Sequence, residues 1–501
     1  MDLDHDACYR AIATRDARFD GRLFTGVKTT GVYCRPICPA RTPRSENVTF
    51  FASAAAAQAA GYRPCLRCRP ETSPDLAAWR GTSNTVSRAL ALIESGALDA
   101  ADVEALADRL GVGERQLRRL FRQHLGASPV AVAQTRRVLL AKQLIHETDL
   151  PMGEVALAAG FGSIRRFNET FQALYARPPG ALRRGASSEA PVQVGEALTL
   201  KLAYRAPYDW EAMLGFLAAR AIPGVEAVAG GAYARTIALK DDRGLVRARP
   251  VGGDRLAVEI WFPRLAALPT IIARLRGLFD LAADPIAIGA HLGRDPALAP
   301  LVAARPGLRV PGAWDGLELA VRAILGQQIT VAAATALAGK LVAAHGEPLP
   351  PALADQTLGL THVFPSAATL AASDLASLGM PRARAMALSG VAAASLTDPL
   401  LFSARRSLDE AIARLKALPG IGEWTAQYIA MRQLREPDAF PHGDIGLMRA
   451  LAGADGQRPS AAQLLDRAEA RRPWRAYAAL HLWASQAPTQ TLEPAHDRTA
   501  A

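Results

Sequence analysis

Four of the five cysteines in this 501-residue chain fall into two short pairs, and this spacing constrains the fold more than any other feature. Cys34 and Cys38 lie in YCRPIC, and Cys65 and Cys68 lie in PCLRC, with 26 residues between the pairs. Two close pairs joined by a loop supply four thiolates at tetrahedral distance, which is typical of a closed structural zinc site. The sequence therefore predicts a small N-terminal domain that binds one Zn²⁺ through four Cys ligands, with Cys8 outside the site.

The charge of the chain is concentrated in its N-terminal part. The formal net charge is +11, and residues 1–185 carry 26 Lys and Arg against 18 Asp and Glu. This balance indicates a polyanionic partner, most simply nucleic acid, although a general Arg-rich composition is the alternative. No run of about 20 apolar residues predicts a membrane span. The acidic start, MDLDHDACYR, is unlike a signal peptide, so we expect a cytoplasmic protein without a membrane partner.

Two segments of the basic part repeat the same pattern. Residues 105–121 (ALADRLGVGERQLRRLF) and 155–171 (VALAAGFGSIRRFNETF) each contain Ala-x-x-x-Gly followed by an apolar i,i+4 pair. A small residue where two helices cross, a glycine in the turn and a second amphipathic helix are typical of a helix-turn-helix. A tight helical hairpin without DNA contact would show similar spacing. The pair resembles the tandem helix-turn-helix of AraC-type regulators, which implies binding to double-stranded DNA through Gln116, Arg118, Arg119, Arg165, Arg166 and Asn168.

Changes in composition divide the chain into a series of domains. SSEAPVQVGEA, residues 187–197, is small and polar and predicts a linker, and a weaker boundary lies near residues 71–83. Strand-like and helical stretches mix between 198 and 310, whereas helical periodicity dominates beyond 311. The predicted fold class is therefore multidomain, α+β and all-α. Its expected parts are a small zinc domain (1–76), a tandem helix-turn-helix domain (80–185), a linker (186–197), an α+β domain (198–310) and an all-α helix-hairpin-helix domain (311–490).

The surroundings of the cysteines identify a family. TTGVYCRPICPARTPRSENVTFF and AAGYRPCLRCRP resemble the N-terminal domain of the Ada-type adaptive-response protein, which removes a methyl group from alkylated DNA phosphate. The resemblance implies that Cys34 accepts the methyl group, that Cys38, Cys65 and Cys68 complete the zinc site, and that Arg35, Arg41 and Arg63 hold the DNA backbone. Zinc-bound sulfur stays a thiolate at neutral pH and so remains a nucleophile. Loss of one negative charge on methylation would tighten DNA binding, most visibly at low salt.

A second motif lies near the C-terminus. In ARLKALPGIGEWTAQYIAMR, residues 413–432, Leu-Pro-Gly-Ile-Gly separates two apolar-periodic segments and predicts a helix-hairpin-helix. Gly420 and Gly422 would let backbone N–H groups approach a DNA phosphate. Asp444 follows 22 residues after Gly422, and the arrangement resembles the helix-hairpin-helix DNA glycosylases, in which an Asp at that place is the essential carboxylate. The alternative is that Asp444 only caps a helix; the two roles are compatible.

Several further segments narrow this resemblance. APYDWEAMLGFLAARA, VRAILGQQITV, LGMPRARA and RPWRAYAALHLW occur in matching order across about residues 198–485 and resemble 3-methyladenine DNA glycosylase II of the AlkA type. The resemblance implies that Phe216, Trp424, Tyr428 and Trp483 surround an extruded alkylated purine, where cation–π attraction would favour a positively charged base. Core packing is the alternative role for these aromatic residues.

Three further features refine the expected chemistry. Trp424 stands where strand-cleaving relatives carry a Lys, so we expect a monofunctional enzyme without a Schiff base. Gln328, in GQQIT, takes the place of the apolar wedge that fills the vacated duplex. The resemblance also implies a monovalent cation on the main-chain carbonyls of Lys416, Leu418 and Ile421.

The leading hypothesis is a fused sensor, transcriptional regulator and repair enzyme that acts on alkylated and promoter DNA and works with RNA polymerase. One alternative is a transcription factor with a purely structural zinc and a non-catalytic C-terminal DNA-recognition module. Another is a glycosylase whose N-terminal domains only tether it to DNA.

Overall fold

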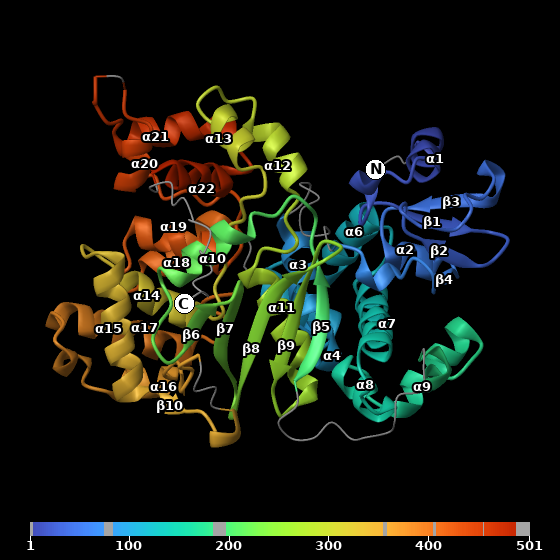
Figure 1. The fold of residues 1–501 in the computed structure, drawn as a ribbon, viewed down its shortest axis with the longest axis horizontal. Coiled ribbons are helices and arrows are strands. Elements are labelled where there is room, and N and C mark those ends of the chain that lie inside the picture. Colours follow the sequence, from blue (N-terminus) through green and yellow to red (C-terminus); the bar gives the residue numbers. More distant parts are fainter. Residues whose placement is uncertain are drawn as a thin grey trace, which may run out of the picture.

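The computed structural model describes residues 4–74, 84–183, 197–353, 358–403, 407–453 and 455–486. The linker predicted at 186–197 lies outside these ranges except for its last residue. The chain folds into several parts that combine helices and sheets, which confirms the predicted fold class (Figure 1). Within the described residues, no helix is both long enough and apolar enough to cross a lipid bilayer.

The N-terminal part is a small four-stranded sheet with two helices. The strand order is β3-β1-β2-β4, and β2 and β4 run parallel while the other pairs are antiparallel. The two cysteine pairs therefore leave adjacent strands, because β2 ends at Cys34 and β4 ends one residue before Cys65. The elements are α1 (His5–Ala13), β1 (Phe24–Val27), β2 (Val32–Cys34), β3 (Val48–Phe51), α2 (Ala54–Ala59) and β4 (Arg63–Pro64).

The next part is helical and contains both predicted helix-turn-helix units. In the first, Asp102 caps α5 and Gly111 ends it with a φ of +64°, a conformation that favours glycine. In the second, Ser163 caps α9 and Gly160 adopts a φ of +88° in the turn. The helices are α3 (Asn84–Glu94), α4 (Ala97–Ala100), α5 (Val103–Leu110), α6 (Glu114–Leu125), α7 (Pro129–Glu147), α8 (Met152–Ala158) and α9 (Ile164–Tyr175).

A five-stranded antiparallel sheet occupies the centre of the molecule (Figure 1). Its strand order is β5-β9-β8-β7-β6, and α10 and α11 accompany it, as expected for an α+β domain. The elements are β5 (Leu198–Ala203), α10 (Trp210–Ala218), β6 (Glu226–Ala229), β7 (Ala232–Leu239), β8 (Asp242–Val251), β9 (Arg255–Trp261), α11 (Leu268–Leu278), α12 (Pro285–Leu292) and α13 (Ala299–Ala304).

The C-terminal part is helical, with one small exception to the expected all-α fold. Two two-residue strands, β10 (Glu347–Pro348) and β11 (His362–Val363), form a short antiparallel ribbon. Such a short pairing carries little periodic signal, and the helical pattern around it is dominant. The helices are α14 (Gly316–Leu325), α15 (Val331–His345), α16 (Ala367–Ala372), α17 (Arg382–Thr397), α18 (Leu408–Lys416), α19 (Glu423–Arg432), α20 (Ile445–Ala450), α21 (Ala461–Ala468) and α22 (Arg475–Gln486).

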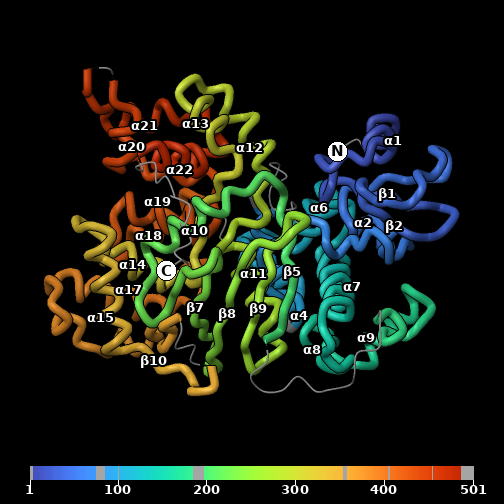
Figure 2. The backbone as a smooth tube through the Cα atoms, viewed as in Figure 1, coloured from blue at the N-terminus to red at the C-terminus, as the bar shows by residue number. Residues whose placement is uncertain are grey.

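The hydrophobic clusters cross the boundaries expected from composition. One cluster unites the second helix-turn-helix unit, including Phe167 and Phe171, with the central sheet. A second cluster unites α12 to α14 with the helices of the C-terminal part. The tube view shows the same arrangement, with α7 lying beside β5 (Figure 2). Contacts between segments far apart in the sequence leave no trace in local composition.

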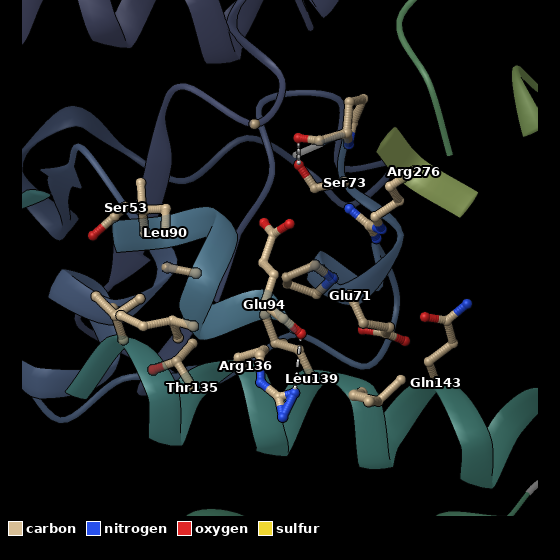
Figure 3. A pocket seen from close by; sticks show the side chains of 18 of the residues that line it. Ser53, Glu71, Ser73, Leu90, Glu94, Thr135, Arg136, Leu139, Gln143 and Arg276 are labelled. Atoms are coloured by element: carbon tan, nitrogen blue, oxygen red, sulfur yellow. Dashed lines mark hydrogen bonds between the residues drawn. The ribbon is translucent and has the colours of Figure 1, made fainter. Parts of the chain in front are cut away.

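Polar contacts also join the N-terminal and C-terminal halves. The Arg88 guanidinium, on α3, donates from Nε and Nη2 to Glu436 Oε1 at 2.9 and 2.5 Å, and both side chains are buried. A cavity of about 220 Å³ lies where the zinc domain, α3, α7 and α11 meet; Glu71, Glu94, Arg136 and Arg276 are among the charged residues around it (Figure 3). These contacts hold the N-terminal and C-terminal halves of the chain against each other.

Candidate functional sites

The four paired cysteines meet at the ends of β2 and β4. Their Sγ atoms all lie within 4.8 Å of one another, as the sequence spacing predicts. A tetrahedral ZnS₄ centre with Zn–S bonds of about 2.3 Å has sulfur–sulfur separations of about 3.8 Å, so the four residues fit one Zn²⁺. Cys8 is buried elsewhere, in the small cluster that packs α1 on the sheet. The donor set is therefore Cys34, Cys38, Cys65 and Cys68.

The four sulfurs lie so close together that they affect one another's ionisation. Contacts with the other three sulfurs raise the pKa of Cys34, while those with Cys34 lower the pKa of Cys65, because so close a set of thiols cannot ionise together without a cation. The backbone N–H of Arg35 donates to Cys68 Sγ, and that of Arg67 donates to Cys65 Sγ, both at 3.4 Å. Cys65 and Cys68 are buried and Cys38 is partly exposed, while Cys34 lies at the boundary between the two classes.

A buried ion pair connects the metal site to the helix-turn-helix part. Lys142, on α7, donates from Nζ to Cys65 O at 2.9 Å and to Glu71 Oε2 at 2.7 Å. The two side chains are 0% and 1% exposed. Burial acts to raise the pKa of Glu71, but Lys142 and Arg69 outweigh it, and the pKa lies below its ordinary value. Sequence reasoning missed this pair, because a lone Lys and a lone Glu carry no motif.

The structure corrects one expected DNA contact at this site. Arg35 is buried, and its guanidinium forms a two-point ion pair with the Asp20 carboxylate and donates to Thr72 Oγ1 at 2.7 Å. With its donors directed inward, Arg35 braces the cysteine loop instead of reaching a phosphate. Arg41 is exposed and Arg63 is half-buried, so both remain at the surface.

The predicted helix-turn-helix contacts lie on exposed faces. Gln116, Arg118 and Arg119 are exposed on α6, while Leu117 and Phe121 of the same helix are buried. Arg165, Arg166 and Asn168 are exposed on α9, opposite the buried Phe167 and Phe171. Arg118 and Arg165 each pair with a Glu of their own helix, Glu114 and Glu169. The two exposed faces therefore have the polarity that groove binding requires.

Asp444 is held by three N–H donors at the start of α20. Its Oδ1 accepts from the Leu447 N–H at 3.0 Å and from Trp483 Nε1 at 2.9 Å. Its Oδ2 accepts from Trp424 Nε1 at 2.8 Å. The helix-cap interpretation and the carboxylate interpretation are thus compatible, since one oxygen caps α20 while two indoles fix the plane of the group.

The close approach of these groups depends on a glycine that sequence reasoning did not single out. A Cβ on Gly446 would lie 2.9 Å from Asp444 Oδ1 and 3.3 Å from Trp483 Cδ1. A side chain there would push the carboxylate and the indole apart. In the sequence, Gly446 is simply the second residue after Asp444, and that position alone does not show that glycine is required there.

The four expected aromatic residues line one cavity with Asp444. Its volume is about 1130 Å³, and Phe216, Trp424, Tyr428 and Trp483 all border it. The rings of Trp424 and Tyr428 stack with centroids 4.9 Å apart and an interplanar angle of 13°. Asp444 and the four aromatic residues are all only partly buried and border the cavity, where Trp424 and Tyr428 cover one face of each other.

Two of the arginines that line this cavity lie over its aromatic rings, and sequence reasoning missed both. Arg432 donates to Pro311 O and Gly312 O at 2.8 Å each and to Tyr428 Oη at 2.6 Å. Arg220 lies 3.9 Å from the centroid of the Phe216 ring. Burial acts to raise the pKa of Tyr428, but the charges of Arg432 and Arg220 outweigh it and hold the pKa below its ordinary value.

The hairpin between α18 and α19 has the predicted form. Gly420 has a φ of +83°, and a Cβ there would lie 2.5 Å from Ala387 Cβ, so both conformation and space require glycine. Gly422 is the N-cap of α19. The carbonyl of Leu418 accepts from the Ile421 N–H at 3.1 Å, and Lys416 ends α18. The cation expected on the carbonyls of Lys416, Leu418 and Ile421 stays a prediction.

The expected wedge lies next to this hairpin. Gln328 is exposed and has a φ of +61°, an uncommon backbone conformation for a residue other than glycine. Its neighbour Gln327 donates from Nε2 to Gly420 O at 2.8 Å, and Gln327 O accepts from Arg384. The Gln327 contacts anchor the loop to the hairpin and leave the Gln328 side chain at the surface.

Family models match three parts of the chain. They are the metal binding domain of Ada at residues 7–71, a helix-turn-helix domain at 106–185 and the AlkA N-terminal domain at 199–315. The solved structure of a 3-methyladenine DNA-glycosylase from Archaeoglobus fulgidus has the same fold as the C-terminal half, with a TM-score of 0.50, 23% identity and coverage of 56% of this chain and 96% of that one.

Similar proteins extend the comparison to the whole chain. The "DNA-3-methyladenine glycosylase 2" of Escherichia coli is 38% identical over 56% of this chain and 95% of its own length. The "Bifunctional transcriptional activator/DNA repair enzyme Ada" of Escherichia coli is 38% identical over 32% of this chain and 43% of its own. The "Probable bifunctional transcriptional activator/DNA repair enzyme AlkA" of Mycobacterium tuberculosis is 44% identical over 96% of this chain and 97% of its own. The chain therefore belongs to the family of bifunctional transcriptional activator/DNA repair enzymes of the AlkA type, in which an Ada-type metal domain and a helix-turn-helix precede a glycosylase.

Proposed function

We propose that this protein senses alkylated DNA phosphate, regulates transcription in response, and excises alkylated purines such as 3-methyladenine. The observation that carries the proposal is the coexistence of two sites on one chain. One is a four-cysteine metal centre beside exposed basic residues, and the other is a carboxylate at the edge of an aromatic cavity. Whole-length similarity to a bifunctional relative supports the same combination.

At the metal centre the reaction is a single displacement. The Cys34 sulfur attacks the methyl carbon of a phosphotriester, an S–C bond forms, the C–O bond breaks, and the phosphate leaves as a diester anion. A Zn²⁺ held by the four cysteines would keep the Cys34 sulfur ionised at neutral pH. The exposure of the thiols does not favour Cys34 over Cys38, so the choice of Cys34 as acceptor rests on the resemblance to the Ada-type domain. Because a thioether does not readily revert, the methyl transfer is stoichiometric, which suits a damage sensor.

Methylation changes the charge that DNA meets. Four thiolates on Zn²⁺ carry a net 2−, and one thioether reduces this to 1−, which weakens repulsion of the phosphates. Arg41 and Arg63 are the residues of the metal domain that we assign to the DNA backbone, and the exposed faces of α6 and α9 read promoter DNA. A change in transcription then requires RNA polymerase as a partner. A reducing cytoplasm keeps the four cysteines from forming disulfides, so that their thiolates stay available.

At the cavity, Asp444 supports loss of the damaged base. An N3- or N7-alkylated purine is cationic and leaves readily, so the enzyme must extrude the nucleotide and provide one negative charge for the oxocarbenium-like sugar. Trp424 and Trp483 orient the carboxylate through their N–H groups. Gln328 enters the space that the base vacates, Gly420 and Gly422 approach a phosphate, and a monovalent cation on the carbonyls of Lys416, Leu418 and Ile421 would strengthen that contact. No Lys lies at position 424, so strand cleavage is not expected.

The decisive test of the catalytic role is the Asp444→Asn variant. It keeps the cap on α20 but removes the charge, so excision of 3-methyladenine should fall at least about 100-fold, or about 2.7 kcal/mol, while binding to undamaged DNA stays unchanged. Single-turnover release of the base measures the first quantity, and fluorescence anisotropy with a labelled duplex measures the second. Normal excision by Asp444→Asn would refute the assignment.

A further inference from the structure

The cavity wall proposed to attract a cationic base already carries cations. Two guanidiniums lie over the ring of Phe216: that of Arg220 at 3.9 Å and that of Arg432 at 4.8 Å from the ring centroid. Both distances fall within the range in which a cation and an aromatic face attract each other. The attraction that would stack an alkylated purine on Phe216 is thus partly satisfied by the protein itself.

Arg305 and Arg449 border the cavity from exposed positions, whereas three other arginines of its wall are each held by several partners. Arg235 and Arg322 both face two buried carboxylates: Arg235 pairs with Glu318 at 2.6 Å, and Arg322 pairs with Glu318 at 2.7 Å and also with Glu226. Arg432 directs its three donor groups to Tyr428 and to two main-chain carbonyls. These three guanidiniums are held from several sides and are part of the fixed wall.

Arg220 differs from these three residues because a hydrogen bond fixes its main chain, whereas no carboxylate in the part of the chain that the structure describes pairs with its guanidinium. Its carbonyl accepts from Arg322 Nη1 at 2.7 Å, which fixes the backbone just beyond α10. Its guanidinium donates only to Phe216 O, at 3.3 Å, and within the described ranges it forms no ion pair with a carboxylate. The side chain is half-buried and borders the cavity with Phe216 and Tyr428. A cation held so weakly on an aromatic face can be displaced.

We propose that Arg220 determines charge specificity in the base pocket: its guanidinium occupies the cation-binding face of Phe216, and a positively charged base must displace it. The proposal rests on the glycosylase function proposed above and adds a substrate preference to it. Arg220 disfavours cationic alkylpurines relative to neutral lesions, because a neutral base does not compete with a guanidinium by charge and is not repelled by it.

The test compares full-length wild type with Arg220→Met, which keeps the length of the side chain without its charge. Two unit charges about 6 Å apart, at an effective dielectric constant near 20, repel strongly enough to change the affinity for a cationic base about 100-fold. Screening by salt reduces this change in affinity to at least about tenfold. The half-saturating concentration for single-turnover excision of 7-methylguanine, a cationic lesion, should fall at least about tenfold in this variant. Excision of hypoxanthine, a neutral lesion, should show no gain.

Two control variants separate charge from packing. Arg220→Lys keeps a positive charge and should stay within about twofold of wild type for both lesions. Arg247→Met removes an arginine that lies 5.5 Å from the Trp261 ring, outside the cavity, and should change neither. Affinity for undamaged duplex should also be equal in all four proteins, which excludes a general effect on DNA binding, and their melting temperatures report intact folding.

Each outcome has a distinct meaning. An unchanged or higher half-saturating concentration of 7-methylguanine in Arg220→Met overturns the proposal. So does an Arg220→Lys variant that behaves like Arg220→Met, because packing would then be responsible. If the wild type releases neither base, the glycosylase function fails before charge specificity is reached, and that result is recognised in the wild type alone.

Discussion

The metal centre and the Asp444 site are both built around acidic groups, but they hold these groups in different ways. At the metal centre, four sulfurs lie within 4.8 Å of one another and need a cation to ionise together. At the other site a single carboxylate accepts three N–H hydrogen bonds from the protein. In the proposed mechanism, methylation consumes one thiolate of the metal centre, whereas Asp444 assists the departure of a base and is left unchanged. The proposal therefore predicts a stoichiometric sensor at the first site and a turnover enzyme at the second.

The largest expected effect comes from breaking the metal centre. Cys65→Ser removes a buried ligand, and because structural zinc sites contribute about 10–16 kcal/mol of apparent binding free energy, the N-terminal domain should lose both its zinc and its fold. Zinc content per chain and protection from proteolysis within residues 4–74 measure the outcome. Cys8→Ser should retain one zinc; a Cys65→Ser protein that also retained one would exclude the four-cysteine centre. Excision of 3-methyladenine should survive, because Asp444 does not depend on the metal.

A smaller effect is expected at the contact between the metal domain and α7 of the helix-turn-helix part. Lys142→Met leaves the Glu71 carboxylate buried without its main partner, which should destabilise the protein by about 3–5 kcal/mol. Chemical denaturation followed by a probe in the N-terminal half measures this change. Adding Glu71→Gln removes the stranded charge, so the double variant should recover much of the loss. If it is as unstable as the single variant, the pair is not the reason.

The smallest effect distinguishes the two indoles that hold Asp444. Trp424→Phe removes the donor recorded for Oδ2, while Trp483→Phe leaves Oδ1 its bond from Leu447 N–H. A hydrogen bond to a charged group contributes about 1.5–3 kcal/mol, so Trp424→Phe should slow excision about tenfold or more, and Trp483→Phe should slow it less. Single-turnover rates at saturating enzyme give the ranking. The reverse ranking would mean that stacking on the base, not orientation of the carboxylate, is the main role of the indoles.

The two sites also differ in how far the sequence predicts them. The spacing of the four cysteines is enough to predict their cluster, because the two pairs come together once the adjacent strands β2 and β4 lie side by side. The aromatic residues and Asp444 were predicted from family resemblance, and the structure brings them around one cavity. The N–H bonds from two indoles to one carboxylate were not predicted, since Trp424 and Trp483 come from helices that meet only in the folded protein.

The errors and omissions have a common physical cause. Arg35 was expected to bind DNA from the resemblance to the Ada-type domain, but the folded chain places Asp20 against it and turns it inward. Arg220 and Arg432 carry no motif, and although each contacts an aromatic residue four positions before it, their other partners lie about 100 residues or more away, at Arg322, Pro311 and Gly312. Likewise, composition separates the helix-turn-helix part from the α+β part, whereas one hydrophobic cluster joins them. Local patterns report on covalent neighbours, and these features depend on tertiary ones.

The most direct test of the account uses DNA that carries both methyl phosphotriesters and 3-methyladenine. Wild type should gain about 14 Da on the peptide that contains Cys34, the mass of one methyl group in place of a proton, and should release 3-methyladenine. Asp444→Asn should gain the same mass and release no base, while Cys34→Ala should release the base and gain no mass. An adduct mapped to Cys38, or the loss of both reactions in either variant, would contradict the assignment of two separate chemical centres to one chain.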